Sequence, residues 1–130
     1  MSLIEKINKV KEFHEAFGIL NNEAPTTQLS KEEIQLRFDL IKEENEEYLE
    51  AANNGDIVEI ADALGDQLYI LFGTMLKHGL QYKIEEVFDE IQKSNMSKLG
   101  ADGKPIYRED GKVMKGPNYF KPNIKSILEK

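Results

Sequence analysis

Two groups of carboxylates lie close together in this chain of 130 residues. Glu43, Glu44, Glu46 and Glu47 form the first group, and after eleven residues Glu59-Ile60-Ala61-Asp62 supplies the second. Acids three or four residues apart share one face of a helix. If a short turn joins two such helices, four or five carboxylates face one another. Their repulsion predicts a divalent cation between them, and oxygen ligands in a chain without cysteine favour Mg²⁺ or Mn²⁺ over zinc.

Local signals around these acids predict the helices that carry them. Ser30 and Glu33 have the spacing of a capping box, and Asp56 is a suitable N-cap for the following helix. Gly18 and Gly79 are stop signals, and Asn53-Asn54-Gly55 predicts a turn. Apolar periodicity then predicts helices at about residues 3–17, 31–52, 57–78 and 83–98, with a last helical turn over 124–129.

The third predicted helix restricts where its acids can lie. One arc of its helical wheel is apolar, and Glu59, Asp62 and Asp66 lie on the far side, next to further apolar residues. A helix that is apolar nearly all round is normally buried all round. We therefore expect its acids to line an interior site or a subunit interface. The apolar arc consists of Ile57, Ile60, Ala61, Leu64, Leu68, Leu71 and Phe72.

The second predicted helix offers more acids than a metal site needs. Glu44 and Glu47 lie nearest its apolar stripe, so they rank above Glu43 as metal ligands. Glu43 is a candidate for holding or deprotonating water, and Glu46 and Glu50 are predicted to be solvated. A glutamate run is often only a solvated helix face. Glu59 has a second interpretation as the partner of Asp56 in a capping box.

The fourth predicted helix and the tail add polar groups. The apolar stripe of residues 84–91 continues onto Asn95 and Lys98, which would then face the interior and suit a phosphate-bearing ligand. Alternatively, Lys98 meets the helix dipole and Asn95 caps a neighbouring group. Turn dipeptides predict a short hairpin within residues 104–113. We expect residues 1–100 to form a four-helix core and residues 101–130 an irregular tail that completes the same single domain.

Charge and composition exclude several function classes. The net charge is −7, and it divides into twenty acids against nine Lys/Arg in residues 1–97 and four against eight in residues 98–130. An acidic body does not suit a nucleic-acid polymer, which needs a basic footprint. No run of about 18 apolar residues is present, and the first residues lack the apolar stretch of a signal peptide. These features, with the absence of cysteine, predict a soluble, cytoplasmic protein that does not enter a membrane.

The residues themselves indicate a hydrolytic mechanism. A divalent cation would bridge a polyphosphate and lower the pKa of bound water. Glu43 or Glu47 would then accept the proton of the attacking water. Lys98, Lys112 or Lys115 would neutralise the departing pyrophosphate. For the base of a nucleotide, the candidate pocket residues are His14, Phe17 and Tyr119.

The two acidic motifs resemble a known signature. Glu43-Glu44-x-x-Glu47 followed by Glu59-x-x-Asp62 is similar to the EExxE…ExxD pattern of the all-α nucleotide pyrophosphohydrolase superfamily. That superfamily includes MazG, the dimeric dUTPases and phosphoribosyl-ATP pyrophosphohydrolase. Residues 59–74, 94–99 and 112–119 look most like its MazG-like branch, and the likeness spans most of residues 10–122.

The resemblance implies an all-α, four-helix MazG-like bundle that forms a homodimer or a dimer of dimers. The implied reaction converts a (d)NTP and water to the (d)NMP and pyrophosphate, as in house-cleaning or dUTP-directed enzymes. By the same likeness Glu44, Glu47, Glu59 and Asp62 would hold Mg²⁺, and Asn95 and Lys98 would contact the nucleotide. Two alternatives stay open: a phosphoribosyl-ATP pyrophosphohydrolase, and a non-catalytic helical dimer that only binds cations.

Overall fold

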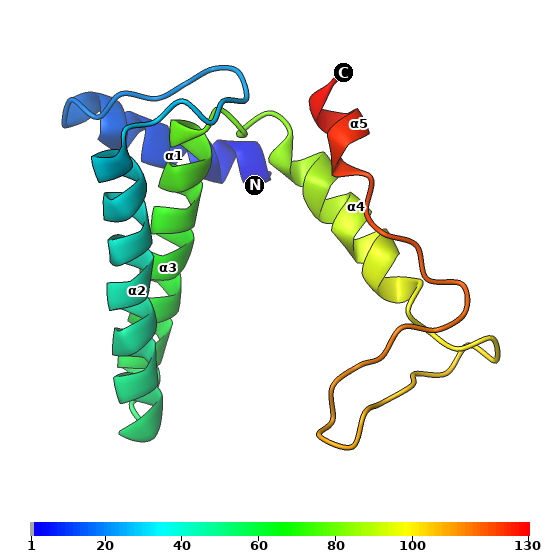
Figure 1. Cartoon of the computed structure of the whole chain (residues 1–130). Coiled ribbons are helices and arrows are strands. Elements are labelled where there is room, and N and C mark those ends of the chain that lie inside the picture. Colours follow the sequence, from blue (N-terminus) through cyan, green and yellow to red (C-terminus); the bar gives the residue numbers. More distant parts are fainter. Residues whose placement is uncertain (1) are drawn as a thin grey trace. The chain divides into compact units, whose positions relative to one another are not determined.

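The computed structural model describes residues 2–130, and every named element of secondary structure in them is a helix (Figure 1). No named strand occurs among these residues, and β-structure is limited to an isolated antiparallel bridge between Tyr107 and Val113. The predicted all-α fold is confirmed. No helix in residues 2–130 combines the length and the apolar character needed to cross a bilayer. The helices are α1 (Leu3–Ala16), α2 (Lys31–Asn53), α3 (Ile57–Lys77), α4 (Ile84–Met96) and α5 (Ile124–Leu128).

The chain divides into two compact units, the first ending at Tyr82 and the second beginning at Lys83. The first unit contains α1, α2 and α3, and the second contains α4, the tail and α5. This division lies before α4, whereas the sequence predicts a core that ends near residue 100. The predicted arrangement of core and tail as one domain stays a prediction.

In the first unit, α2 and α3 form a helical hairpin, and α1 packs against α3 (Figure 1). Ile7 and Val10 of α1 and Leu76 of α3 are buried and form the centre of this packing. His14 lies on the same stripe of α1 and is buried with them. The face of α1 that the apolar spacing predicts is therefore the face that packs.

The ends of α2 and α3 form as their local sequence predicts. Both hydrogen bonds of the capping box at Ser30 and Glu33 are present. The Asp56 side chain accepts a hydrogen bond from the Glu59 N–H at the start of α3. Gly55, with φ +65°, makes the tight turn between the two helices. This short connection holds α2 and α3 side by side along their length.

Within the first unit, α1 and α2 leave the apolar arc of α3 exposed. Leu64, Leu68 and Leu71 are 45%, 54% and 43% exposed, and Ile57 is 73% exposed. Burial of α3 on every side would therefore require the subunit interface that the sequence offers as one alternative, and it stays a prediction. The physical reason for the exposure is that α2 and α1 cover only the opposite face, where the buried residues are Ala63, Gly73, Leu76 and Lys77.

In the second unit, α4 packs against α5, and the connecting tail folds back on itself. Hydrogen bonds from Arg108 N to Lys112 O (2.8 Å) and from Met114 N to Ile106 O (2.7 Å) flank the bridge between Tyr107 and Val113. The predicted hairpin is thus present as one short bridged turn. Ser94 of α4 donates a hydrogen bond to the Phe120 carbonyl and attaches the end of the tail to the helix.

Candidate active site

Three carboxylates meet in the contact between α2 and α3, which we call the α2/α3 seam. One carboxylate oxygen from each of Glu44, Glu47 and Asp66 lies within 4.8 Å of the other two. Glu44 and Glu47 are one turn apart on α2, and Asp66 approaches from α3. Glu44 and Asp66 are half-buried and Glu47 is exposed, so the cluster opens to solvent on one side.

The electrostatics of this cluster are unfavourable in the protein alone. Burial, together with a hydrogen bond to Glu47 and the negative charges of Glu47, Asp66 and Glu43, raises the pKa of Glu44 to about 7. Burial and the charges of Asp62 and Glu47 also raise the pKa of Asp66. The Glu44 Oε2 atom is buried and has no hydrogen-bond partner. A buried oxygen without a partner carries a desolvation cost that a ligand would offset.

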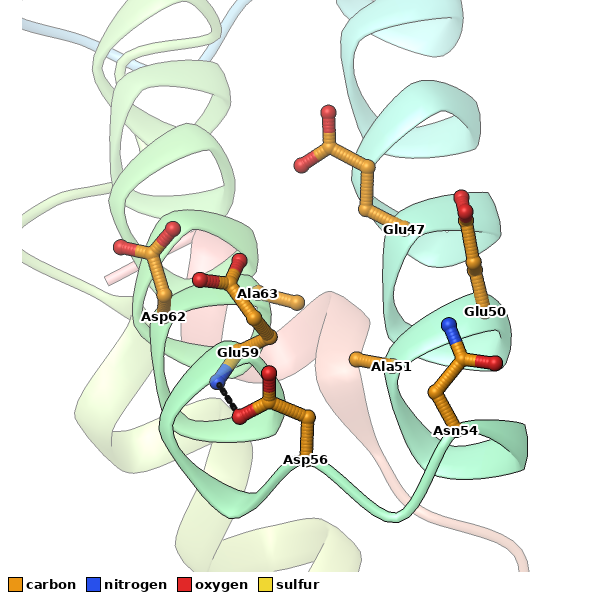
Figure 2. Close-up of a pocket in the computed structure, with 8 residues that line it drawn as sticks. All are labelled: Glu47, Glu50, Ala51, Asn54, Asp56, Glu59, Asp62 and Ala63. Carbon is orange, nitrogen blue, oxygen red and sulfur yellow. Dashed lines mark hydrogen bonds between the residues drawn. The ribbon is translucent and has the colours of Figure 1, made fainter.

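An open pocket of about 430 Å³ lies in the same seam, toward the turn that joins the two helices. Figure 2 shows the Glu47 carboxylate reaching from α2 toward α3 and the Glu59 and Asp62 carboxylates projecting from α3, and all three residues line the pocket. Glu47 therefore belongs both to the cluster with Glu44 and Asp66 and to this pocket. The other residues that line the pocket are Glu50, Ala51, Asn54, Asp56 and Ala63.

Of the two hydrogen bonds that a capping box between Asp56 and Glu59 requires, one is present. Asp56 accepts a hydrogen bond of 3.2 Å from the Glu59 N–H, as an N-cap does. The Asp56 N–H, however, donates to the Ala51 carbonyl at 3.1 Å and not to the Glu59 side chain. The capping box is therefore incomplete at this end of α3, and the Glu59 carboxylate faces the pocket without that role.

These side chains fit a divalent cation. All the donors are carboxylate oxygens, which hard cations such as Mg²⁺ and Mn²⁺ prefer. Within residues 2–130, no ion pair joins Glu44, Glu47, Glu59, Asp62 or Asp66 to a lysine or arginine. The unpartnered Glu44 Oε2 supplies a ready ligand atom.

Comparison with known proteins identifies the family. The sequence profile of the phosphoribosyl-ATP pyrophosphohydrolase family matches residues 10–95, a segment that contains both acidic motifs and all of α2 and α3. The chain belongs to this family. The superfamily predicted from the two acidic motifs is thereby confirmed, and the matching profile is that of the branch ranked second to the MazG-like one.

Two individual relatives are similar to this family member. "Uncharacterized protein L479" of Acanthamoeba polyphaga mimivirus is 34% identical over 93 residues, which is 69% of this chain and 37% of that protein. The chain thus spans little more than a third of the length of this curated relative. A crystal structure of "a putative NTP pyrophosphohydrolase" from Exiguobacterium sp. 255-15 shares the fold, with a TM-score of 0.55 and 23% identity over 98% of this chain and 95% of that one.

The four predicted metal ligands lie in two neighbouring places, the carboxylate cluster and the pocket. Glu44 lies in the cluster and Glu59 and Asp62 line the pocket, while Glu47 reaches both. The cluster also includes Asp66, to which the sequence assigned no role. The sequence feature that pointed to Asp66 was its position one turn after Asp62 in an otherwise apolar helix. Their roles as metal ligands stay predictions.

The other acids of α2 lie outside the cluster. Glu43 and Glu46 are exposed and belong to neither the cluster nor the pocket. Glu43 acts on the cluster only through its charge, which contributes to the raised pKa of Glu44. Glu50 is exposed, as predicted, but it also lines the pocket.

All five predicted substrate-binding residues lie in the second unit. Asn95 is exposed, and Lys98 is half-buried with its carbonyl oxygen bonded to the Gly116 N–H at 2.8 Å. The Lys115 Nζ lies 4.8 Å from the centre of the Tyr119 ring, a cation–π contact that holds these two residues together. Lys112 is exposed. Their contacts with a nucleotide stay predictions.

Proposed function

We propose that this protein is a metal-dependent nucleoside triphosphate pyrophosphohydrolase that converts a (d)NTP and water to the (d)NMP and pyrophosphate. The observation that carries the proposal is the carboxylate cluster of Glu44, Glu47 and Asp66, in which a buried oxygen has no partner. Membership of a pyrophosphohydrolase family supports the same reaction type.

Glu44, Glu47, Glu59 and Asp62 would hold Mg²⁺ or Mn²⁺, and the position of Asp66 supports its addition to this set. Such a cation, when bound, offsets the charge of the phosphates and lowers the pKa of coordinated water. Glu47 faces both the cluster and the pocket, so it can orient a water molecule and accept its proton. Glu43 is the second candidate for that role.

The second unit would supply positive charge to the triphosphate. Residues 98–130 carry eight lysines and arginines against four acids. Lys98, Lys112 and Lys115 are the predicted donors to the phosphate oxygens, and Asn95 and Tyr119 are predicted to contact the nucleoside. Their proposed contribution is binding and orientation, and no covalent intermediate is required.

A homodimer is the proposed assembly. Leu64, Leu68 and Leu71 form an exposed apolar stripe on α3, on the face away from α2 and α1. Contiguous apolar surface of this kind is typical of interaction sites. The same stripe on a second copy would cover it, and pairing of such dimers into a tetramer is the further option.

One observation favours a second candidate substrate. The matching family profile is that of phosphoribosyl-ATP pyrophosphohydrolase, so phosphoribosyl-ATP belongs in any assay next to the ordinary nucleotides. Both substrates would undergo the same hydrolysis of a phosphoric anhydride at the same carboxylates.

Pyrophosphate release tests the proposal. The purified protein is incubated with Mg²⁺ or Mn²⁺ and each of the eight common NTPs and dNTPs, and with phosphoribosyl-ATP. We expect turnover of at least one compound, and a loss of 100-fold or more in Glu47→Gln and Asp62→Asn, on the scale of a lost general base or charge-stabilising group. Glu46→Gln is the matched control, since Glu46 is exposed beside the site. Absence of turnover across the whole panel would instead support a non-catalytic dimer that binds cations.

A further inference from the structure

Arg37 lies in the α2/α3 seam without an acidic partner. It is half-buried, and within residues 2–130 no carboxylate forms an ion pair with its guanidinium. Burial lowers the pKa of Arg37, although the group stays charged at any physiological pH. A charge that leaves water without a counter-ion opposes folding. An apolar residue would avoid this cost, so Arg37 has a role other than filling space between the helices.

The guanidinium of Arg37 joins α2 to two groups on α3. Its Nε donates to Thr74 Oγ1 at 2.9 Å, and its Nη2 donates to the Ile70 carbonyl at 2.7 Å. The Thr74 hydroxyl donates to the same carbonyl at 3.0 Å, so the three residues form one hydrogen-bonded set, which we call the Arg37 clamp. A planar guanidinium fits few arrangements of its acceptors, whereas apolar side chains can repack in several. A polar contact of this kind can therefore fix the register of two helices.

Gly73 provides the space that the Arg37 clamp needs. A Cβ at this position would lie 2.6 Å from Arg37 Nη2 and 2.9 Å from His14 Nε2. Both distances are shorter than a carbon atom tolerates, so a larger residue would displace the guanidinium. Gly73 is buried within α3 and its φ is not positive, which means that the helix itself does not require a glycine here. The close approach of Arg37 and His14 does require one.

The clamp and the carboxylate cluster are separated by the same interval on both helices. Seven residues separate Arg37 from Glu44 on α2, and seven separate Asp66 from Gly73 on α3. Seven residues are close to two full turns, so on each helix the two positions share one face and lie about 10 Å apart along the axis. The two helices form a hairpin, in which Arg37 approaches Gly73 and Glu44 approaches Asp66. The register that forms the clamp is therefore the register that brings the carboxylates together.

The carboxylates oppose this arrangement by themselves. Oxygens of Glu44, Glu47 and Asp66 lie within 4.8 Å of one another, and like charges at that distance repel. A lysine or arginine placed among them would relieve the repulsion, but it would also compete with a cation for the same oxygens. Arg37 lies two turns away and bonds to neutral groups instead. The clamp can thus hold the two helices against the repulsion and leave the carboxylate oxygens free.

We propose that Arg37 is a positioning residue, whose clamp on α3 holds Glu44, Glu47 and Asp66 in the arrangement that binds the divalent cation. Arg37 does not ligate the metal. Its contribution is to fix the ligands before the cation arrives, as a preorganised site requires. The inference rests on the proposed metal site and adds the residue that positions it.

Binding of Mn²⁺ in the absence of nucleotide, followed by the EPR signal of the free ion, tests the proposal. Arg37→Met removes both hydrogen bonds and one positive charge. Loss of the charge alone would strengthen the binding of a cation, because Arg37 repels it. We expect the opposite, an affinity about tenfold weaker, as when a group that orients metal ligands is removed. Equal or tighter binding would overturn the proposal. Lys42→Met, which removes an exposed charge from the same helix, is the control and should not weaken binding.

Gly73→Ala displaces the guanidinium and keeps its charge. It should weaken Mn²⁺ binding to a similar degree. Gly65→Ala is the matched control in the same helix, since its Cβ would meet no atom within 4 Å, and it should bind Mn²⁺ as the unsubstituted protein does. Circular dichroism and urea unfolding in EDTA establish that each variant is folded. If Gly73→Ala does not fold, Thr74→Val removes the acceptor of Arg37 Nε with little change of shape and should also weaken binding. Equal affinity of the folded clamp variant and Gly65→Ala would contradict the proposal.

A measurement without metal distinguishes this inference from the proposed reaction. Gln67 Nε2 donates to Asn45 Oδ1 across the seam at 3.4 Å, neither residue is buried, and the chain has no cysteine. Spin labels on Asn45→Cys and Gln67→Cys therefore report the separation of α2 and α3 beside the cluster, in EDTA. We expect one narrow distance with Arg37 present and a longer or broader distribution in Arg37→Met. An unchanged distribution would refute the clamp even in a protein that hydrolyses nucleotides. A changed distribution would support the clamp even if no nucleotide were hydrolysed.

Discussion

Glu44→Gln gives the most direct test of the electrostatics of the site. The pKa of Glu44 rises from 4.5 to about 7 on folding, because burial and the neighbouring carboxylates oppose its ionisation. An acid with a raised folded pKa binds more protons when folded between these two values. Stability is therefore greatest below pH 4.5, falls as pH rises toward 7, and is constant above it. Glutamine keeps the shape of the side chain and removes the ionisation.

The size of the effect follows from that shift. Each pKa unit corresponds to about 1.4 kcal/mol, so a fully buried group would lose roughly 3 kcal/mol between pH 4.5 and 7. Glu44 is half-buried and faces an open pocket, where water screens part of the repulsion. We therefore expect Glu44→Gln without metal to be more stable than the unsubstituted protein by about 1–2 kcal/mol at pH 8, and nearly equal to it at pH 4.5.

Urea unfolding followed by circular dichroism, in EDTA at pH 4.5, 6 and 8, measures this difference. Comparing the two proteins at each pH cancels the titration of most other groups. Glu46→Gln is the control and should show no comparable dependence on pH. Addition of Mg²⁺ at pH 8 should stabilise the unsubstituted protein more than Glu44→Gln, because a ligand stabilises the state that binds it. A variant that is less stable at pH 8, or a difference that does not change with pH, would refute the reasoning.

Three further predictions concern the scaffold. The Lys77 ammonium and the hydrogen bonds with Ser30 lower the pKa of Glu33 to about 2. The stability that the Glu33 carboxylate adds above pH 4.5 is therefore lost as pH falls toward 2. In thermal melts, Glu33→Gln should be less stable than the unsubstituted protein at pH 6 and equally stable at pH 2. Gly79→Ala should lower the free energy of unfolding, measured in urea, by more than about 2 kcal/mol, because φ is +67° and the new Cβ would lie 2.0 Å from a backbone oxygen. Gly55→Ala is the control, and it should lower the same free energy by about 1 kcal/mol, because φ is +65° but no atom lies within 4 Å of the new Cβ. Leu68→Glu should shift the proposed dimer to monomer in analytical ultracentrifugation, and Leu20→Glu, on an exposed loop, should not.

The helix boundaries were predictable because their signals are local. Ser30 and Glu33 are three residues apart, and so are Asp56 and the N–H that it caps. Such contacts depend on the conformation of one turn and on nothing distant. The same applies to the face of α1 that carries His14, since periodicity defines the face. The predicted and observed ends of the four main helices therefore differ by only one or two residues.

The surroundings of α3 were not predictable by the same means. Its wheel shows that Leu64 and Leu68 are apolar and that Asp66 lies opposite, but hydropathy does not state which face a neighbour covers. In the single chain, α2 packs on the acidic side and leaves the leucines exposed. Asp66 lies with Glu44 and Glu47 in the contact with α2, whereas Glu59 and Asp62 are exposed. The expectation that these acids line an interior site or a subunit interface stays a prediction.

A cavity of about 410 Å³, whose lining includes Arg37 and His14, had almost no signal in the sequence. Its parts come from three helices, and Gly73 matters only because two side chains from other helices approach it. A glycine inside a helix can indicate such a close approach, yet it does not identify the residues that come near. Which atoms meet there depends on the helix contacts in three dimensions.

The register between α2 and α3 links every part of the site. At one end Lys77 Nζ lies 2.9 Å from Glu33, and one turn further along α2 Arg37 bonds to Thr74 and to the Ile70 carbonyl. At the other end the turn through Gly55 closes the hairpin. These contacts set Arg37 opposite Gly73 and Glu44 opposite Asp66. A shift of one residue would turn the acids of one helix by about 100° and separate them. The carboxylates can therefore repel one another without opening the site, since contacts on both sides of them hold the two helices in place.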